Sequence, residues 1–153
     1  MGSQMAHTYS SLLFHCVFST KDRRAAISRE LQPQLWAYMG GIAREHGMKA
    51  LAVGGTENHI HVLLSLPATQ AIAQAMREIK KGSSQWMHET AGVPGFAWQE
   101  GYGAFSIGHA QVEATLAYIA GQREHHEKRD FEVEFFAILR KHEISFDERF
   151  VLG

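Results

Sequence analysis

The chain has a single cysteine and no long apolar segment. With only Cys16 available, no disulfide can form within the chain, which agrees with a reducing compartment. Cys16 lies in an apolar stretch, so we expect it to fill the core rather than to act as a nucleophile. No apolar run approaches the roughly 20 residues of a membrane-spanning helix, and residues 1–5 lack the basic-then-apolar pattern of a signal peptide. We therefore expect a cytoplasmic protein that has no membrane partner.

The sequence also lacks an excess of either charge, internal repeats and low-complexity segments. Its formal net charge of −1 neither favours nor excludes a nucleic-acid partner, because the distribution of charge matters more than its sum. A length of 153 residues, with 45% hydrophobic and 20% charged residues, is typical of one globular domain. We therefore expect a single domain over residues 1–153, in which residues 1–6 are a disordered end or a remnant of cloning.

Hydrophobic periodicity predicts an alternation of strands and helices. Runs of β-forming residues predict strands at 9–20, 48–53, 59–66 and 96–107, and apolar residues at helical spacing predict helices at 28–46, 70–91 and 110–128. Residues 131–139 are expected to form a short helix, and the tail at 141–153 is expected to dock on a surface, either of this chain or of a partner subunit. The first six elements follow the order βαββαβ. This order predicts an α+β, ferredoxin-like (RRM-like) sandwich, in which an antiparallel sheet has helices on one face and a C-terminal helix bears Tyr118.

Two histidines stand one residue apart at the start of the third predicted strand. Successive side chains of a strand point to opposite faces, so His59 and His61 share a face while Ile60 points away. Neutral imidazole is the commonest protein metal ligand, and such a pair can chelate one ion if another element supplies a third ligand. A histidine pair of this kind is nevertheless more often structural than metal-binding.

A tyrosine and a glutamine lie one helical turn apart in the helix predicted at 110–128. Tyr118 and Gln122 are four residues apart, so their side chains share one face. If this face packs over the histidine face of the strand, Gln122 Oε1 completes a metal site and Tyr118 faces a metal-bound phosphate. A divalent ion there would stabilise developing charge while the tyrosine oxygen attacks phosphorus. Taken alone, Tyr118 is a packing residue with a solvated hydroxyl and Gln122 is a solvated helix residue.

Three segments in this order resemble the motifs of a known family. The sequence is similar to the IS200/IS605 single-tyrosine (Y1, HUH) transposases in ENHIHVL at 57–63, WQEGYGAFS at 98–106 and YIAGQREHH at 118–126, and the tail is similar in FEVEF at 131–135 and HEISFDERF at 142–150. The resemblance runs from about residue 9 to the end. It implies an enzyme that cuts single-stranded DNA and rejoins it to another end through a 5′-phosphotyrosine intermediate, without a nucleotide cofactor.

The resemblance gives a role to each residue singled out above. It implies that His59 and His61 are the HUH metal ligands, Tyr118 the nucleophile and Gln122 the third protein ligand, with Mg²⁺ or Mn²⁺ as the ion. It also implies a homodimer, in which the tyrosine helix can serve the partner's histidine pair, and a single-stranded DNA substrate with hairpin ends. Softer ions such as Zn²⁺ or Ni²⁺ would also suit two imidazoles, so ligand type leaves the metal open. The general base stays open too, with His125 and His126 as candidates.

Basic and aromatic residues elsewhere predict contacts with DNA. The candidates for phosphate contacts or base stacking are Lys21, Arg23, Arg24, Arg77, Lys80, Lys81, Trp98 and Tyr102. A solvated surface explains any one of the cations equally well, and a core position explains Trp98. Two rival functions are a domesticated relative that acts at chromosomal repeats, and a non-catalytic ferredoxin-like module that binds nucleic acid or senses metal.

Overall fold

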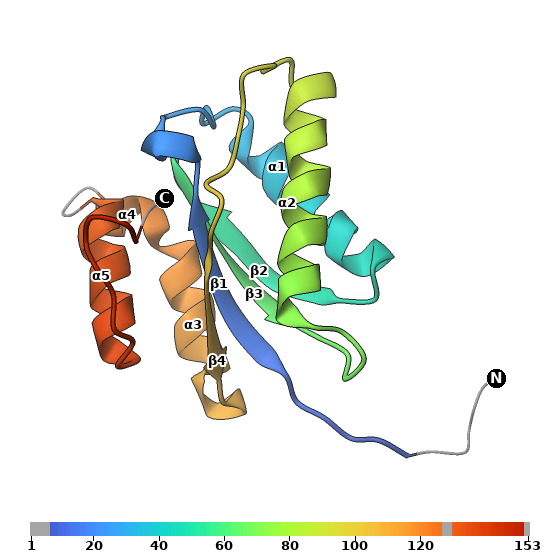
Figure 1. Ribbon diagram of the computed structural model, residues 1–153. Coiled ribbons are helices and arrows are strands. Elements are labelled where there is room, and N and C mark those ends of the chain that lie inside the picture. The colour runs from blue at the N-terminus through green and yellow to red at the C-terminus, as the bar shows by residue number, and fades with distance from the viewer. Residues whose placement is uncertain (1–6, 127–129, 152–153) are drawn as a thin grey trace.

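A single four-stranded antiparallel sheet organises the computed structural model, which describes residues 7–126 and 130–151. The strands are β1 (Leu13–Ser19), β2 (Lys49–Gly55), β3 (His59–Ser65) and β4 (Gly103–Ile107), in the order β2-β3-β1-β4. Figure 1 shows β1 and β3 at the centre of this sheet. The predicted disordered or cloning-derived end, residues 1–6, lies outside the described residues.

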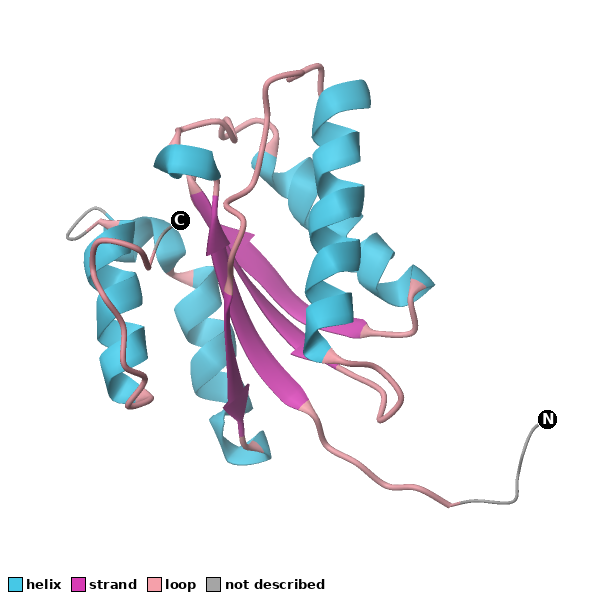
Figure 2. Ribbon diagram, in the orientation of Figure 1, coloured by secondary structure: helices cyan, strands magenta, loops and turns pink. Residues whose placement is uncertain are grey.

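Helices cover both faces of the sheet (Figures 1 and 2). The helices α1 (Gln32–Glu45) and α2 (Ile72–Glu89) pack on one face, and α3 (Val112–Ala120), α4 (Gln122–His126) and α5 (Phe131–Lys141) pack on the other. Two short 3-10 turns, η1 (Lys21–Arg23) and η2 (His109–Gln111), connect elements. The βαββαβ order and the antiparallel sheet confirm the predicted α+β, ferredoxin-like fold.

The two faces of the sheet follow from the alternation of side chains along the central strands. Cys16 and Phe18 of β1, with Ile60 of β3, lie in the core under α1 and α2. Val17 points the other way and packs in a second apolar cluster with residues of α5. Burial raises the pKa of the Cys16 thiol to about 12, and its side chain is fully buried. The expectation that Cys16 fills the core is therefore confirmed.

A glycine in β2 allows α3 to lie close to the sheet. A Cβ atom at Gly54 would stand 2.7 Å from the backbone oxygen of Ile119 and 2.9 Å from Ile119 Cγ2. Real Cβ atoms do not approach other heavy atoms so closely, so any larger residue here would push α3 away from the strand. The position of Tyr118, one residue before Ile119, therefore depends on glycine, which has no side chain, at position 54.

Two predicted elements differ most from the structure. The strand predicted at 96–107 is a strand only over Gly103–Ile107. Before it, Gln99 takes over the pairing with β1, because its backbone N donates to Ser19 O at 2.9 Å and its side-chain Oε1 accepts from Ser19 N at 2.7 Å. The helix predicted at 110–128 is divided at Gly121 into α3 and α4, and residues 127–129 lie outside the described residues.

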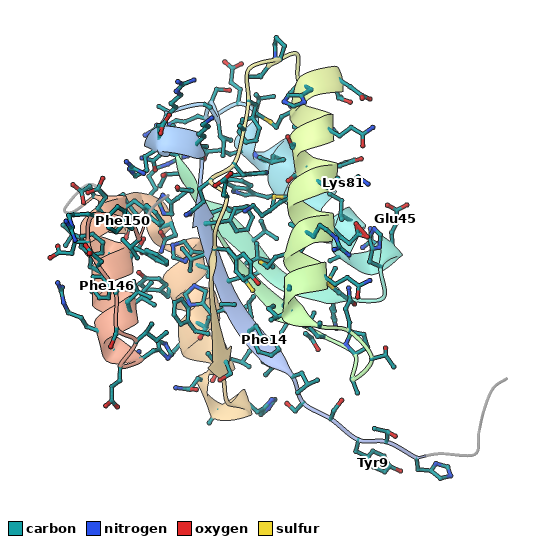
Figure 3. The ribbon with its side chains drawn as sticks, in the orientation of Figure 1. Tyr9, Phe14, Glu45, Lys81, Phe146 and Phe150 are labelled. Atoms are coloured by element: carbon teal, nitrogen blue, oxygen red, sulfur yellow. The ribbon has the colours of Figure 1, made fainter. Side chains whose placement is uncertain are left out.

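The C-terminal tail packs against its own chain. Phe146 stacks on Phe136 of α5 with ring centroids 5.3 Å apart, and Val151 packs against the cluster beneath α5. Figure 3 shows Phe146 and Phe150 beside α5, whereas Tyr9 lies on the extended N-terminal arm, away from the sheet. The prediction that the tail docks on a surface is confirmed, and that surface is α5.

Candidate metal centre and tyrosine

The two histidines of β3 point to the face that α3, α4 and α5 cover. His61 pairs with Val17 and His59 with Ser19 across the β1–β3 ladder, so both imidazoles lie on the same side of the sheet as Val17. Both side chains are completely buried. A polar ring in such a position needs hydrogen-bond partners or a bound ion.

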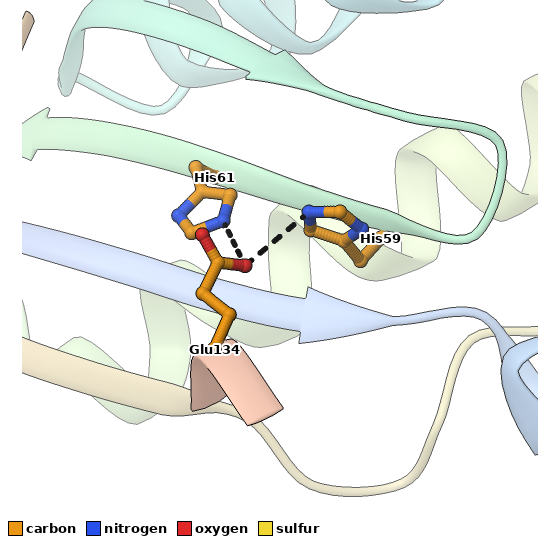
Figure 4. A group of neighbouring side chains, drawn as sticks. All are labelled: His59, His61 and Glu134. Atoms are coloured by element: carbon orange, nitrogen blue, oxygen red, sulfur yellow. Dashed lines mark hydrogen bonds and ion pairs between the residues drawn. The ribbon is translucent and has the colours of Figure 1, made fainter. Parts of the chain in front are cut away.

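A carboxylate from α5 lies between the two imidazoles (Figure 4). Glu134 Oε1 is 3.6 Å from His59 Nε2 and 3.3 Å from His61 Nε2. The same oxygen accepts a hydrogen bond from His126 Nε2 at 2.9 Å. Glu134 is only 1% exposed, so its carboxylate is held in place by this set of partners.

Gln122 and Tyr118 reach the same carboxylate from α4 and α3. Gln122 Oε1 lies 2.9 Å from His59 Nε2, and Gln122 Nε2 donates to Glu134 Oε2 at 3.1 Å. The Tyr118 hydroxyl donates a short hydrogen bond to Glu134 Oε2. Although Gly121 interrupts the helix, Gln122 Nε2 also contacts the backbone oxygen of Tyr118 at 3.3 Å. The tyrosine, the glutamine and both histidines thus meet within one chain.

Second partners orient the two rings. His61 Nδ1 lies 2.8 Å from Nε2 of His15 on β1. A ligating Nε2 must present its lone pair, so Nδ1 of His61 then carries the proton and His15 accepts it. His59 Nδ1 lies 3.0 Å from Thr56 Oγ1 and 3.0 Å from Asn58 Oδ1. Sequence reasoning missed His15, which stands in a strand with no motif to mark it.

Burial keeps the imidazoles of His59 and His15 neutral. It lowers the pKa of both His59 and His15 to about 3, and the nearby His61 lowers them further. Burial alone would raise the pKa of Glu134, but hydrogen bonds from His126, His61 and Tyr118 hold that pKa well below its usual range. The cluster therefore combines a neutral imidazole at His59 with an ionised carboxylate at Glu134.

The hydrogen bonds of His59 indicate a place for a cation. Its two nitrogens face two amide oxygens, Asn58 Oδ1 and Gln122 Oε1, but a neutral ring carries only one proton. The Gln122 amide cannot be turned round without cost, because its Nε2 donates to Glu134. In the tautomer that protonates Nδ1, the lone pair of His59 Nε2 faces Gln122 Oε1 at 2.9 Å, and a cation between these two atoms would be bound by both.

The donor atoms also have a suitable spacing for one ion. His59, His61 and Glu134 offer ligand atoms that all lie within 4.8 Å of one another, and Gln122 Oε1 adds an atom 2.9 Å from His59 Nε2. An ion with ligands at about 2.1 Å in octahedral geometry has adjacent ligands about 3 Å apart. The residues present thus fit a divalent ion with mixed nitrogen and oxygen ligands.

Comparison with known proteins gives the family. A sequence model of the family described as "Transposase IS200 like" matches residues 8–122, which is most of the chain. The chain belongs to the IS200-like transposase family. A search of curated proteins found no match.

Two solved structures support the fold of this IS200-like transposase. A provisionally assigned transposase from Deinococcus radiodurans R1 is 20% identical, with a TM-score of 0.60, and the match covers 80% of this chain and 98% of that one. The REP-associated tyrosine transposase, solved with a bound REP hairpin, is 20% identical with a TM-score of 0.57, and the match covers 82% of this chain and 74% of that one. At this identity the likeness concerns the fold alone.

Sequence reasoning gave no role to Glu134, although it lies at the centre of the site. Glu134 follows Gln122 by 12 residues, on a separate helix, so no spacing rule links the two side chains. The FEVEF segment at 131–135, which includes Glu134, is part of the family resemblance. It is the sequence feature that could have pointed to this glutamate. His126 also belongs to the cluster, with a side chain 11% exposed and bonded to Glu134.

Three of the basic residues predicted to bind DNA lie near the end of β1. Arg23 pairs with Glu132 of α5 at 3.0 Å, which places it on the side of the sheet that holds the site. Arg24 lies 3.8 Å from Asp22 and is largely exposed. Lys21 is exposed as well. A role in DNA binding stays a prediction for all three.

The remaining DNA-binding candidates lie on or near α2, on the opposite face of the sheet from Tyr118 (Figure 1). Arg77 and Lys81 are exposed. Lys80 Nζ instead donates to the backbone oxygens of residues 99, 100 and 101, at 2.7, 3.1 and 2.9 Å, and so holds the segment before β4. Tyr102 is 37% exposed.

Trp98 lies in the core rather than on a DNA-binding surface. Its side chain is 8% exposed, it packs edge-on against Phe18 and Phe96, and its Nε1 donates to Ser83 Oγ at 2.9 Å. With both sides of the ring covered by protein, Trp98 has no face for a base. The core role is the one that the structure favours. Among the described residues, no helix has the length and apolar character needed to cross a membrane.

Proposed function

We propose that this IS200-like transposase cuts and rejoins single-stranded DNA through a covalent bond between Tyr118 and a 5′-phosphate. The observation that carries the proposal is the hydrogen bond from the Tyr118 hydroxyl to Glu134, whose other oxygen faces Nε2 of both His59 and His61. A nucleophile and a candidate metal site thereby share one carboxylate.

His59, His61, Gln122 and Glu134 are the residues that would hold the divalent ion, which we propose is Mg²⁺ or Mn²⁺. A bound ion supplies Lewis-acid stabilisation of the negative charge that develops on the phosphoryl oxygens. His15, Thr56 and Asn58 orient the two imidazoles for that role.

Tyr118 performs a transesterification. Its oxygen forms a bond to phosphorus while the bond from phosphorus to the 3′-oxygen of the preceding nucleotide breaks. The phenol loses its proton and the departing 3′-oxygen gains one, so the leaving group is a 3′-hydroxyl. Glu134 orients the phenol through the hydrogen bond it accepts. Because one phosphodiester replaces another, a 3′-hydroxyl can reverse the step and join strands without a nucleotide cofactor.

We propose that the substrate is single-stranded DNA with hairpin ends. The support is the solved REP-associated tyrosine transposase, which shares the fold and holds a REP hairpin. We further propose that the chain acts as a homodimer in the cytoplasm. The contacts of Tyr118 with Glu134, and of Glu134 with the histidines, join residues of one chain, which supports attack by Tyr118 on DNA bound by the histidines of the same chain.

A gel assay tests the proposal. Single-stranded oligonucleotides from the flanks of the gene, labelled at the 3′ end, are incubated with the protein and Mn²⁺ and resolved on a denaturing gel. We expect a covalent protein–DNA species in the wild-type protein and in Tyr38→Phe, whose tyrosine lies on α1, on the opposite face of the sheet from the site. We expect none in Tyr118→Phe, nor in the wild-type protein treated with EDTA.

The outcomes separate the alternatives. DNA binding without any covalent species across such oligonucleotides would contradict the proposal and favour a non-catalytic binding module. A covalent species that persists in Tyr118→Phe would assign the nucleophile elsewhere. Unchanged cleavage in both His59→Ala and His61→Ala would contradict the proposed metal site. Loss of cleavage with retained hairpin binding would support the metal site.

A further inference from the structure

Two grooves lie on different sides of a buried group that we call the polar cluster, which consists of His59, His61, Tyr118, Gln122 and Glu134. The first, of about 410 Å³, runs between the η2–α3 segment and α5; we call it the α3–α5 groove, and its walls include Gln111, Ala114, Thr115, Tyr118, Ala137 and Lys141. The second, of about 420 Å³, lies beside α4; we call it the α4 groove, and its walls include Arg29, Thr56, Asn58, Arg123, His126 and Phe131. Both volumes are in the range of small-ligand sites.

The order of residues along α5 places Glu134 between the two grooves. Phe131 lines the α4 groove, Glu134 follows about one turn later, and the α3–α5 groove begins at Ala137. The sheet repeats this order, because Asn58, the partner of His59, lines the α4 groove, and His15, the partner of His61, lines the α3–α5 groove.

Along α3 and α4, the two grooves and the polar cluster between them follow one another in the opposite order. The α3–α5 groove ends at Tyr118, Gln122 belongs to the cluster, and the α4 groove begins at Arg123. Three separate elements therefore place the cluster between the grooves. A linear polymer whose backbone is cut at the cluster must leave it on both sides, and these two grooves adjoin it on both sides.

The lining of the α3–α5 groove fits an unpaired nucleotide. Lys141 supplies a cation for a phosphate, and none of the described residues that line the groove is Asp or Glu. The small side chains of Ala114 and Ala137 leave room between the helices. Gln111 Oε1 accepts from Gly108 N at 2.7 Å, which leaves the Gln111 side-chain Nε2 as a donor for a base edge.

We propose that the α3–α5 groove binds one unpaired nucleotide of the cut strand, next to the phosphate that Tyr118 attacks. The groove begins at the tyrosine itself, so a nucleotide in it would adjoin the reacting phosphate. The inference rests on the proposed function, because it takes Tyr118 as the nucleophile.

Filling the groove tests the proposal. In Ala114→Phe a large ring enters the groove from an exposed position of α3 that has no part in the polar cluster. Ala73→Phe makes the same change at an exposed position of α2, on the opposite face of the sheet, and is the matched control. The probes are fluorescein-labelled single-stranded oligonucleotides from the flanks of the gene, intact or with one abasic site moved along the strand, and the readouts are anisotropy for affinity and KM and kcat for cleavage.

We expect Ala114→Phe to weaken binding and raise KM about tenfold or more, as the loss of one stacked base does, while Ala73→Phe matches the wild-type protein. An abasic site at one position beside the cut should weaken binding to the wild-type protein by a similar factor. The same abasic site should have little further effect in Ala114→Phe. Wild-type affinity and KM in a folded Ala114→Phe would overturn the proposal.

Crosslinking of the wild-type protein gives a second test that depends on no variant. With 4-thiothymidine placed beside the cut, we expect crosslinks to residues 111–115 or 137–142, and crosslinks confined to other segments would overturn the groove assignment. The two levels of the account fail differently. A covalent species lost in Tyr118→Phe, together with unaltered Ala114→Phe, refutes the groove alone, whereas no covalent species in the wild-type protein refutes the proposed function.

Discussion

Replacing Glu134 by glutamine separates its structural role from its proposed role as a metal ligand. The carboxylate is buried and accepts hydrogen bonds from Tyr118, Gln122 and His126. Glutamine has nearly the same shape but presents an amide Nε2 where one oxygen stood, so an oxygen that accepted from Tyr118 and Gln122, or from His126, is replaced by a donor. In the metal-free protein we expect a loss of about 1 to 3 kcal/mol in the free energy of unfolding.

The metal-dependent part of the effect adds to this loss and can be measured separately. A ligand that binds only the folded state adds RT ln(1 + [L]/Kd) to stability, so each tenfold loss of affinity removes about 1.4 kcal/mol of metal-linked stabilisation. Loss of the only anionic ligand in the set should weaken Mn²⁺ binding at least tenfold, by analogy with the 10 to 100-fold cost of losing an outer-sphere partner.

Urea unfolding in EDTA and in excess MnCl₂ provides the assay. The matched control is Glu132→Gln, on the same helix, whose carboxylate is 47% exposed and pairs with Arg23. We expect Mn²⁺ to stabilise the wild-type protein and Glu132→Gln equally, and Glu134→Gln by at least about 1.4 kcal/mol less. An equal Mn²⁺-dependent increase in all three proteins would refute the assignment of Glu134 as a ligand.

Three further predictions concern the packing and protonation of the site. The pKa values of His59 and His15 are lowered to about 3, so the unfolded chain binds more protons than the folded one between about pH 3 and pH 6.5. The free energy of unfolding of the metal-free protein should therefore fall with falling pH by up to about 2.7 kcal/mol per pH unit. A urea midpoint that stays constant from pH 7 to pH 5 would contradict this prediction. Gly54→Ala should lower the free energy of unfolding by about 1 to 3 kcal/mol and reduce cleavage, because its Cβ would meet Ile119 O at 2.7 Å. The control Gly40→Ala has nothing within 4 Å of its Cβ, so it should leave the free energy of unfolding unchanged or raise it by up to about 1 kcal/mol. Cys16, with its thiol fully buried and its pKa raised to about 12, should resist iodoacetamide until the protein unfolds, and rapid labelling of the native protein would contradict its core position.

Local patterns were sufficient to predict most of the fold. The alternation that placed His59 and His61 on one face is a property of any strand, and the four-residue spacing of Tyr118 and Gln122 is a property of any helix. Both patterns survive in the structure, even though Gly121 divides the helix between the tyrosine and the glutamine. The predicted meeting of the two faces is confirmed by the contact of Gln122 Oε1 with His59 Nε2 at 2.9 Å.

Features that depend on tertiary packing could not be predicted in this way. Glu134 reaches the histidines because α5 folds back over the sheet, and nothing in the local pattern of α5 shows which of its glutamates points inward. Glu132 and Glu134 are two residues apart, yet the first is about half exposed and the second is buried. Trp98 shows the converse case: an aromatic residue beside a glycine-rich stretch was a candidate for base stacking, but it fills the core.

The central claim is that Tyr118, held by Glu134 beside the two histidines, is the residue that bonds to DNA. Peptide mapping of the covalent protein–DNA species, with fragmentation of the DNA-linked peptide, tests it directly, because the chain contains only 4 tyrosines. The account predicts a phosphodeoxynucleotide on Tyr118, formed only when divalent metal is present. A DNA link to Tyr9, Tyr38 or Tyr102, or to a residue of another type, would contradict it.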